Sequence, residues 1–190
     1  MSKEAPEILS FENVSKDFGK IPACRGLTFS VQAGTIHAIV GENGAGKSTA
    51  MNLLFGLFAP TSGTLRVAQK EVHFHSSLDA IRSGIGMVHQ HFVLAEELSA
   101  LENILLQMGP RQVWRPLRLK KQIVVIEDLA RKYGLEVPLQ KKISELSVGE
   151  QQRVEILKSL IHHPQILILD EPTAVLTPQE VLPFFAQLRE

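Results

Sequence analysis

The nine residues GENGAGKST, at positions 41–49, place three glycines, a lysine and adjacent hydroxyls where phosphate chemistry would need them. The spacing of Gly41, four residues, Gly46, Lys47 and Ser48 is that of a phosphate-binding loop. Because glycine has no Cβ, backbone amides in such a loop can approach phosphate oxygens closely. The ammonium of Lys47 can reach the β- and γ-phosphates, and the hydroxyl of Ser48 is a ligand for Mg²⁺. The stretch therefore predicts a nucleoside triphosphate site.

The residues around this loop strengthen the prediction. Thr35–Val40 has the composition of a strand, and a helix is expected to begin near Lys47 and to end near Gly56. The start of that helix would add unpaired amides and the positive end of its dipole. A flexible glycine turn is the plainer alternative, but average residue frequencies give a chance match in roughly one chain in a hundred of this length.

A second candidate group follows an apolar run in the last third of the chain. Ile166–Leu169 is expected to form a buried strand that delivers Asp170 at its carboxyl end, where open α/β sheets bind ligands. Asp170 suits a contact to Mg²⁺ through water, and Glu171 can orient or deprotonate a water that attacks the γ-phosphate. Two acids standing alone would more often form a solvated loop, so this interpretation depends on the phosphate loop upstream.

The elements that must position these residues are expected to form an α/β fold with crossover connections. β-type segments are predicted at Ile8–Val14 and Leu27–Val31, and residues 91–145 are predicted to form an inserted helical subdomain. That region includes an amphipathic helix over Lys120–Tyr133. The last third is expected to contain a helix over Val148–His162, the strand described above and a final helix from Pro178.

Composition excludes several classes of function. The chain has 190 residues, 44% of them hydrophobic, which is sufficient for one packed domain. Lysine plus arginine and aspartate plus glutamate each number 20, so no nucleic-acid partner is expected. The single cysteine, Cys24, permits no internal disulfide and fits a cytoplasmic protein. No apolar run reaches the roughly 18 residues of a membrane span.

The stretch LSVGEQQR, at 146–153, resembles the signature motif of ABC-type ATPases, the nucleotide-binding subunits of ABC transporters. Gln90 in MVHQHF resembles the Q-loop glutamine of that family, and Phe18 in KDFGK stands where the family places an aromatic on adenine. The motifs occur in the family's order from Phe18 to Thr177. The resemblance implies a P-loop NTPase core with an N-terminal antiparallel β-subdomain, within one partial nucleotide-binding domain over residues 1–190.

The resemblance also implies ATP and Mg²⁺ as ligands and assigns a role to each matching residue. The catalytic residues would be Glu171, Gln90 and Lys47, and the metal ligands would be Ser48, Gln90 and Asp170. The residues expected to contact ATP come from the adenine position, the phosphate loop and the signature motif: Phe18, Gly41, Asn43, Gly44, Ala45, Gly46, Lys47, Ser48, Thr49, Ser147, Gly149 and Glu150.

The signature motif can be interpreted from its residues alone as a helix start. Ser147 followed by Glu150 predicts a capping box. Val148 stands where the family commonly has glycine and Glu150 where it commonly has glutamine, so a carboxylate would lie near the transferred phosphate. We expect the cap to hold that carboxylate. A cap and an anion site use the same unpaired amides, so the two interpretations share one physical basis.

The resemblance predicts how the chain would work with others. Each ATP would lie between the phosphate loop of one domain and the signature motif of a second, in a homodimer or with a tandem half. Membrane-spanning permease subunits would contact the region from Phe92 to about Arg115, and an external solute-binding protein would act indirectly. The protein would be peripheral on the inner face of the membrane. Stretches such as SALENI and EPTAVLTPQE resemble the first nucleotide-binding half of simple sugar or nucleoside importers.

Departures from the family pattern leave alternatives open. All seven histidines precede Asp170, so no residue can serve as the family's switch histidine, and Thr177 stands where an aspartate is frequent. The expected final helix stops at Glu190 before a further strand, which predicts a truncated piece of a longer ATPase. The chain is therefore expected to be an importer ATPase, an ATP-gated dimerisation module with little turnover, or an ABC-type ATPase without a membrane partner.

Overall fold

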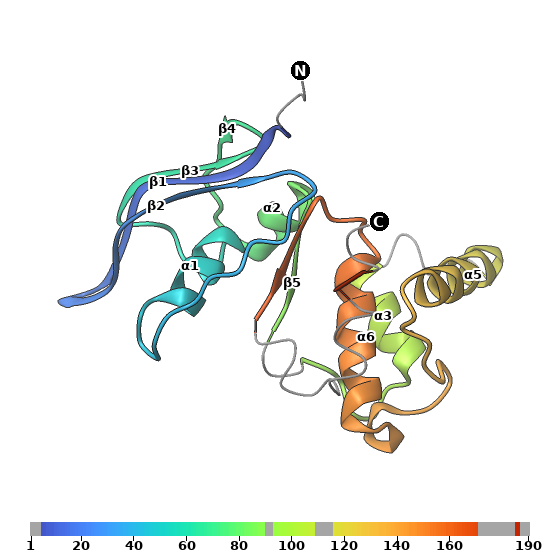
Figure 1. Ribbon diagram of the computed structural model, residues 1–190. Helices are drawn as coiled ribbons and strands as arrows, with labels where there is room; N and C mark the ends of the chain where they lie inside the picture. Colours follow the sequence, from blue (N-terminus) through green and yellow to red (C-terminus); the bar gives the residue numbers. More distant parts are fainter. Residues whose placement is uncertain (1–4, 90–92, 109–115, 171–184, 187–190) are drawn as a thin grey trace. The chain divides into compact units, whose positions relative to one another are not determined.

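The computed structural model describes residues 5–89, 93–108, 116–170 and 185–186 (Figure 1). The chain forms two compact units that divide between Ile85 and Gly86. Within the described ranges, no helix is both long and apolar enough to cross a membrane.

The first unit is built on a four-stranded antiparallel sheet with strand order β2-β1-β3-β4. β1 spans Glu7–Phe18, β2 spans Ile21–Gln32, β3 spans Ser62–Val67 and β4 spans Lys70–Glu71. β1 and β2 lie side by side along their length and are much longer than the segments expected from sequence (Figure 1). The N-terminal antiparallel β-subdomain is confirmed.

A bulge in β1 explains how one long strand fills the core of this unit. Phe11 and Val14 are both only 1% exposed although strict alternation would put them on opposite faces. The register with β2 shifts between these two residues, and Asn13 adopts a left-handed φ of 56°. The extra residue turns Val14 back toward the core. Phe11 also stacks on Phe29 of β2, with ring centroids 4.6 Å apart.

Helix α1, Lys47–Leu54, follows the glycine loop as predicted. Its end is fixed by Gly56, whose φ is 76°. The amide of Gly56 donates to the carbonyl of Leu53 at 3.2 Å, and that of Leu57 donates to Asn52 at 2.9 Å. These two bonds form a Schellman motif, which satisfies the last carbonyls of the helix. The unit also contains the short helix α2, Ser77–Arg82.

The prediction of a strand at Thr35–Val40 is wrong. Residues 35–40 carry no regular secondary structure, and Ile36, Ile39 and Val40 are exposed, Val40 to 91%. Composition predicts a strand, but a strand exists only when a neighbouring strand pairs with its backbone. None of the described strands pairs with this segment. Its backbone therefore stays outside the two sheets that the structure describes.

The second unit contains a pair of strands, β5 (Ile85–Val88) and β6 (Ile166–Leu169). The amide of Asp170 donates to the carbonyl of Val88 at 3.1 Å, so the two strands end together. All four residues of β5 are buried, as expected for a strand inside a core. The predicted strand at 166–169 and its acidic end at Asp170 are confirmed, but of its four residues only Ile168 is fully buried, whereas a buried strand was expected.

Three helices pack together in this unit: α3 (Ala100–Met108), α5 (Pro116–Lys132) and α6 (Val148–Leu160). A single-turn 3₁₀ helix, Ile143–Glu145, precedes α6. Both α3 and α5 contact α6 (Figure 1). The predicted helices at 120–133 and 148–162 are confirmed with small shifts of their ends. Residues with no exposed surface form the centre of this core: Ala100, Ile104, Ile126, Val154, Ile156 and Leu157.

The final helix expected from Pro178 lies outside the described residues except at 185–186, which are helical. The borders at 91 and 145 of the predicted helical subdomain stay a prediction.

Substitution of Leu157 by alanine should test the importance of this core. Leu157 is completely buried, so its truncation should cost about 2–5 kcal/mol in the free energy of unfolding. Leu106 on α3 is 66% exposed, and Leu106→Ala should change that free energy by no more than about 0.5 kcal/mol. Urea unfolding of both variants gives the comparison, and equal losses would contradict the packing described.

Candidate functional site

The glycine loop has the backbone conformation that phosphate binding requires. Gly44 and Gly46 have left-handed φ values of 85° and 86°. Left-handed residues next to right-handed ones form concave segments whose N–H groups converge on an anion. Gly46 is also the N-cap of α1 and receives no side-chain cap, and the loop from Gly41 to Ala45 is exposed to solvent. The start of α1 therefore presents its amides to a ligand rather than to a capping side chain.

Gly46 lies against the sheet in a way that only glycine permits. A Cβ at this position would lie 2.7 Å from the carbonyl oxygen of Ala23 and 3.1 Å from the Cβ of Cys24, both on β2. The loop is thereby seated directly on β2. Cys24 is buried beneath it, and burial raises the pKa of its thiol.

The ammonium of Lys47 bridges two backbone carbonyls at the start of the loop. Its Nζ donates to the carbonyl oxygens of Gly41 at 2.7 Å and Glu42 at 2.8 Å. An ionised phosphate oxygen attracts an ammonium more strongly than a neutral carbonyl at the same distance. A bound phosphate can therefore draw Lys47 away from these carbonyls.

The other loop residues lie at or near the protein surface. Asn43 and Ala45 lie at the exposed turn, where the amide of Ala45 donates to Glu42 at 3.2 Å. Ser48 is exposed and Thr49 is half-buried in the first turn of α1. The hydroxyl of Ser48 in the first unit and the carboxylate of Asp170 in the second are each hard oxygen donors, the kind of ligand that Mg²⁺ prefers.

Phe18 lies at the end of β1 with 44% of its surface exposed. Phe58, just beyond α1, meets it edge to face at a centroid distance of 5.0 Å. The Nζ of Lys16 lies 5.2 Å from the centroid of Phe18 and donates to the carbonyl of Ala59 at 2.7 Å. Such an edge contact fixes the plane of an exposed ring. The sequence does not indicate a role for Phe58, because no local pattern links residues forty positions apart.

The signature stretch forms the expected capping box at the start of α6. The carboxylate of Glu150 accepts from the amide and the hydroxyl of Ser147, each at 2.8 Å, and the amide of Glu150 donates to that hydroxyl at 3.4 Å. These bonds lower the pKa of Glu150. The cap therefore holds the carboxylate, as predicted. A Cβ built on Gly149 meets nothing within 4 Å, so a ligand has room to approach its backbone.

Asp170 is half-buried at the common end of β5 and β6. Gln90 follows β5 by two residues and Glu171 follows Asp170 directly, and both lie outside the described residues. The predicted site residues thus divide between the two units. The first holds Phe18 and the loop at 41–49, and the second holds Ser147, Gly149, Glu150 and Asp170.

Comparison with known proteins gives a family match. The family model described as ABC transporter matches residues 24–174. The chain is 46% identical over 174 residues to the guanosine import ATP-binding protein NupO of Bacillus subtilis, covering 92% of this chain and 34% of that protein. It is 40% identical to the ribose import ATP-binding protein RbsA of Hahella chejuensis, over 96% of this chain and 36% of that protein. The chain thus spans about a third of the length of these relatives.

Solved structures give the same result. A nucleotide-free ATP-binding cassette from an ABC transporter has a TM-score of 0.82 and 26% identity, covering 96% of this chain and 76% of that one. The ADP conformation of an ATP-binding cassette has a TM-score of 0.81 and 27% identity, with the same coverage.

Substitution of Gly44 and Gly46 by alanine should distinguish two costs in the free energy of unfolding. One is the cost of a left-handed backbone, and the other is the cost of a Cβ packed against β2. Both Gly44 and Gly46 are left-handed, so alanine at either should cost about 1–2 kcal/mol in the free energy of unfolding. Only Gly46→Ala also forces a Cβ against the backbone of β2, whereas nothing lies within 4 Å at Gly44. Gly46→Ala should therefore destabilise more, as measured by urea unfolding without nucleotide. Equal losses would show that the loop is not seated on β2.

The capping box predicts a pH dependence. Because the folded-state pKa of Glu150 is below its ordinary value of 4.5, its contribution to stability is complete above that value and is lost as the pH falls through the lowered one. Glu150→Gln removes this titration while preserving size. The stability difference between wild type and Glu150→Gln should be constant near neutral pH and should shrink below pH 4.5. A difference that grows on acidification would contradict the cap.

Proposed function

The chain belongs to the ABC transporter family, and on that basis we propose that it binds and hydrolyses ATP to energise import of a small polar solute such as a sugar or nucleoside. The family match and the solved structures confirm the predicted fold class. The observation that carries the proposal is the glycine loop, which combines two left-handed glycines, the ammonium of Lys47 and an uncapped helix start.

ATP would extend from Phe18 to the loop in the first unit. The exposed ring of Phe18 would stack on adenine, and the amides of residues 41–49 with Lys47 would hold the phosphates. Ser48, Gln90 and Asp170 would hold Mg²⁺, which neutralises charge on the phosphate oxygens.

Hydrolysis would depend on Glu171 and Gln90. Glu171 would accept a proton from a water whose oxygen attacks the γ-phosphorus, and Gln90 would orient that water. As the new P–O bond forms, the bond to the β–γ bridging oxygen breaks, and ADP and phosphate result. Lys47 would stabilise the charge that develops on the phosphate oxygens.

A second nucleotide-binding domain would complete the site. The start of α6 in one domain, with Ser147, Gly149 and Glu150, would face the γ-phosphate bound to the other. Because the Glu150 carboxylate is engaged with Ser147, it would be held within the cap when the anion approaches. The open space at Gly149 supports this approach. The second domain would be another copy or a tandem half.

The membrane partner would bind next to α3. A hollow of about 510 Å³ is lined by both apolar and polar residues, and Val93 and Leu106 in it are 68% and 66% exposed. Its lining residues are Val93, Leu94, Ala95, Asn103, Leu106, Gln107 and Lys158. All of its lining residues except Lys158 belong to the described part of the region from 92 to 115. An apolar segment of a permease subunit would fit this hollow and would hold the chain on the inner face of the membrane. An external solute-binding protein would then act through the permease.

Two substitutions should separate binding from hydrolysis. Lys47→Ala removes the ammonium at the loop and should weaken ATP binding at least about tenfold. Glu171→Gln removes the base but not the phosphate contacts, so ATP binding should be preserved while turnover falls by roughly 10² or more. Fluorescent ATP titration and phosphate release measure the two effects. Unchanged binding by Lys47→Ala would overturn the assignment of the loop, and full turnover by Glu171→Gln would exclude Glu171 as the base.

A further inference from the structure

Helix α6 makes a second set of polar contacts, which begins at Glu155, eight residues after Ser147. The backbone amide and carbonyl of Val93 are both bonded to side chains of this helix. Its amide donates to Oε1 of Glu155 at 2.6 Å, and its carbonyl accepts from Nζ of Lys158 at 2.7 Å. Glu155 and Lys158 also form an ion pair at 3.2 Å.

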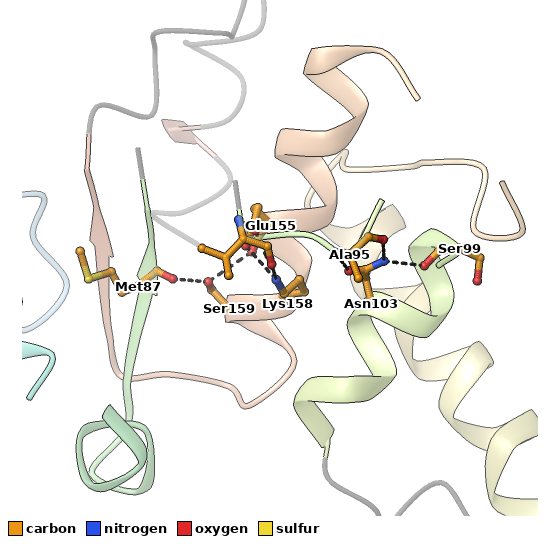
Figure 2. A network of polar contacts seen from close by, with 8 residues as sticks. Met87, Ala95, Ser99, Asn103, Glu155, Lys158 and Ser159 are labelled. Carbon is orange, nitrogen blue, oxygen red and sulfur yellow. Dashed lines mark hydrogen bonds and ion pairs between the residues drawn. The ribbon is translucent and has the colours of Figure 1, made fainter. Parts of the chain in front are cut away.

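Ser159 of the same helix holds a different part of the chain. Its hydroxyl donates to the carbonyl of Met87 in β5 at 2.7 Å (Figure 2). Met87 lies three residues before Gln90, and Val93 lies three residues after it. Three side chains within little more than one turn of α6 thus fasten both flanks of the segment that carries Gln90.

The burial of Glu155 and Lys158 indicates the role of their contacts with Val93. The side chains of Glu155 and Lys158 are only 5% and 7% exposed, whereas Val93 is 68% exposed. The contacts therefore fix the backbone of Val93 and do not bury its side chain. A buried ion pair adds little net stability, because desolvation of two charges offsets their attraction. Its effect here is to hold a loop in one position.

The chain beyond Val93 is fastened in the same manner. The side chain of Asn103 on α3, which is 2% exposed, accepts from the amide of Ala95 at 2.8 Å and donates to its carbonyl at 3.1 Å (Figure 2). The segment from 93 to 95 is thus held by side chains of two helices that pack on each other.

We propose that Glu155, Lys158 and Ser159 are positioning residues that fasten both flanks of the Gln90 loop to helix α6. The functional part rests on the proposed role of Gln90 in ATP hydrolysis. The helix rises 1.5 Å per residue, so Glu155 lies about 12 Å along its axis from Ser147. The described flanks of Gln90, at Met87 and Val93, and the capping box at Ser147 thus belong to one helix or contact it directly.

The test uses a double variant that removes the polar clamp without leaving a lone buried charge. Glu155→Leu with Lys158→Met should preserve the unfolding midpoint, because apolar residues of similar size replace buried ion pairs at little cost. Exchange of the Val93 amide hydrogen should accelerate at least about tenfold, since its acceptor is lost. Glu97→Gln is the matched control, because Glu97 forms an exposed ion pair with Lys142 at 3.2 Å in the same unit. The control should leave this exchange unchanged.

Turnover measurements then test the link to Gln90. In the parent chain the double variant should lower kcat about tenfold or more with ATP affinity unchanged, whereas in a Gln90→Ala background it should have less than about a twofold further effect. If the double variant does not fold, Ser159→Ala, which removes the hydroxyl that donates to the carbonyl of Met87, is compared in the same two backgrounds.

The outcomes are distinct. Unchanged exchange at Val93 would overturn the clamp. Equal losses of kcat with and without Gln90 would show that the clamp stabilises the fold without positioning Gln90, and would overturn the positioning role. If Gln90→Ala alone left turnover unchanged, or if the parent chain had no turnover, the proposed function would fail in its catalytic part, and the exchange result would still decide whether the clamp exists.

Discussion

Backbone N–H and C=O groups that leave water must find partners, and this constraint accounts for the main features of both units. The end of α1 satisfies its carbonyls through Gly56, and the start of α6 satisfies its amides through Ser147 and Glu150. Val93 has both of its backbone groups paired with side chains of α6. Residues 35–40, which no described strand pairs, remain exposed.

The same constraint distinguishes the two helix starts that matter for function. α1 begins at Gly46 without a side-chain cap, so its first amides are available to an anion. α6 begins with a complete capping box, so its amides are partly satisfied before any ligand arrives. The two helix starts are therefore suited to different roles. The start of α1 is suited to binding phosphate directly, and the start of α6 is suited to contacting a phosphate that is already bound elsewhere.

Much of the secondary structure could be predicted because its signals are local. The end of α1, the helices at 120–133 and 148–162 and the strand at 166–169 follow from periodicity, caps and glycines. The expected strand at Thr35–Val40 failed because an apolar composition cannot supply a pairing strand. Gly56 ends α1 near the predicted position, and Leu57 beyond it is 47% exposed.

The sequence by itself determined the phosphate-loop spacing and the capping box, because these depend on residues within a few positions of one another. Only the tertiary structure decided which distant groups meet. It seats Gly46 on β2, sets Phe58 against Phe18, and brings Glu155 and Lys158 to Val93 across 62 and 65 positions of the chain. Such contacts form only when the core of Ile126, Ile156 and Leu157 and the sheet have fixed the separations between elements, and no local pattern encodes those separations.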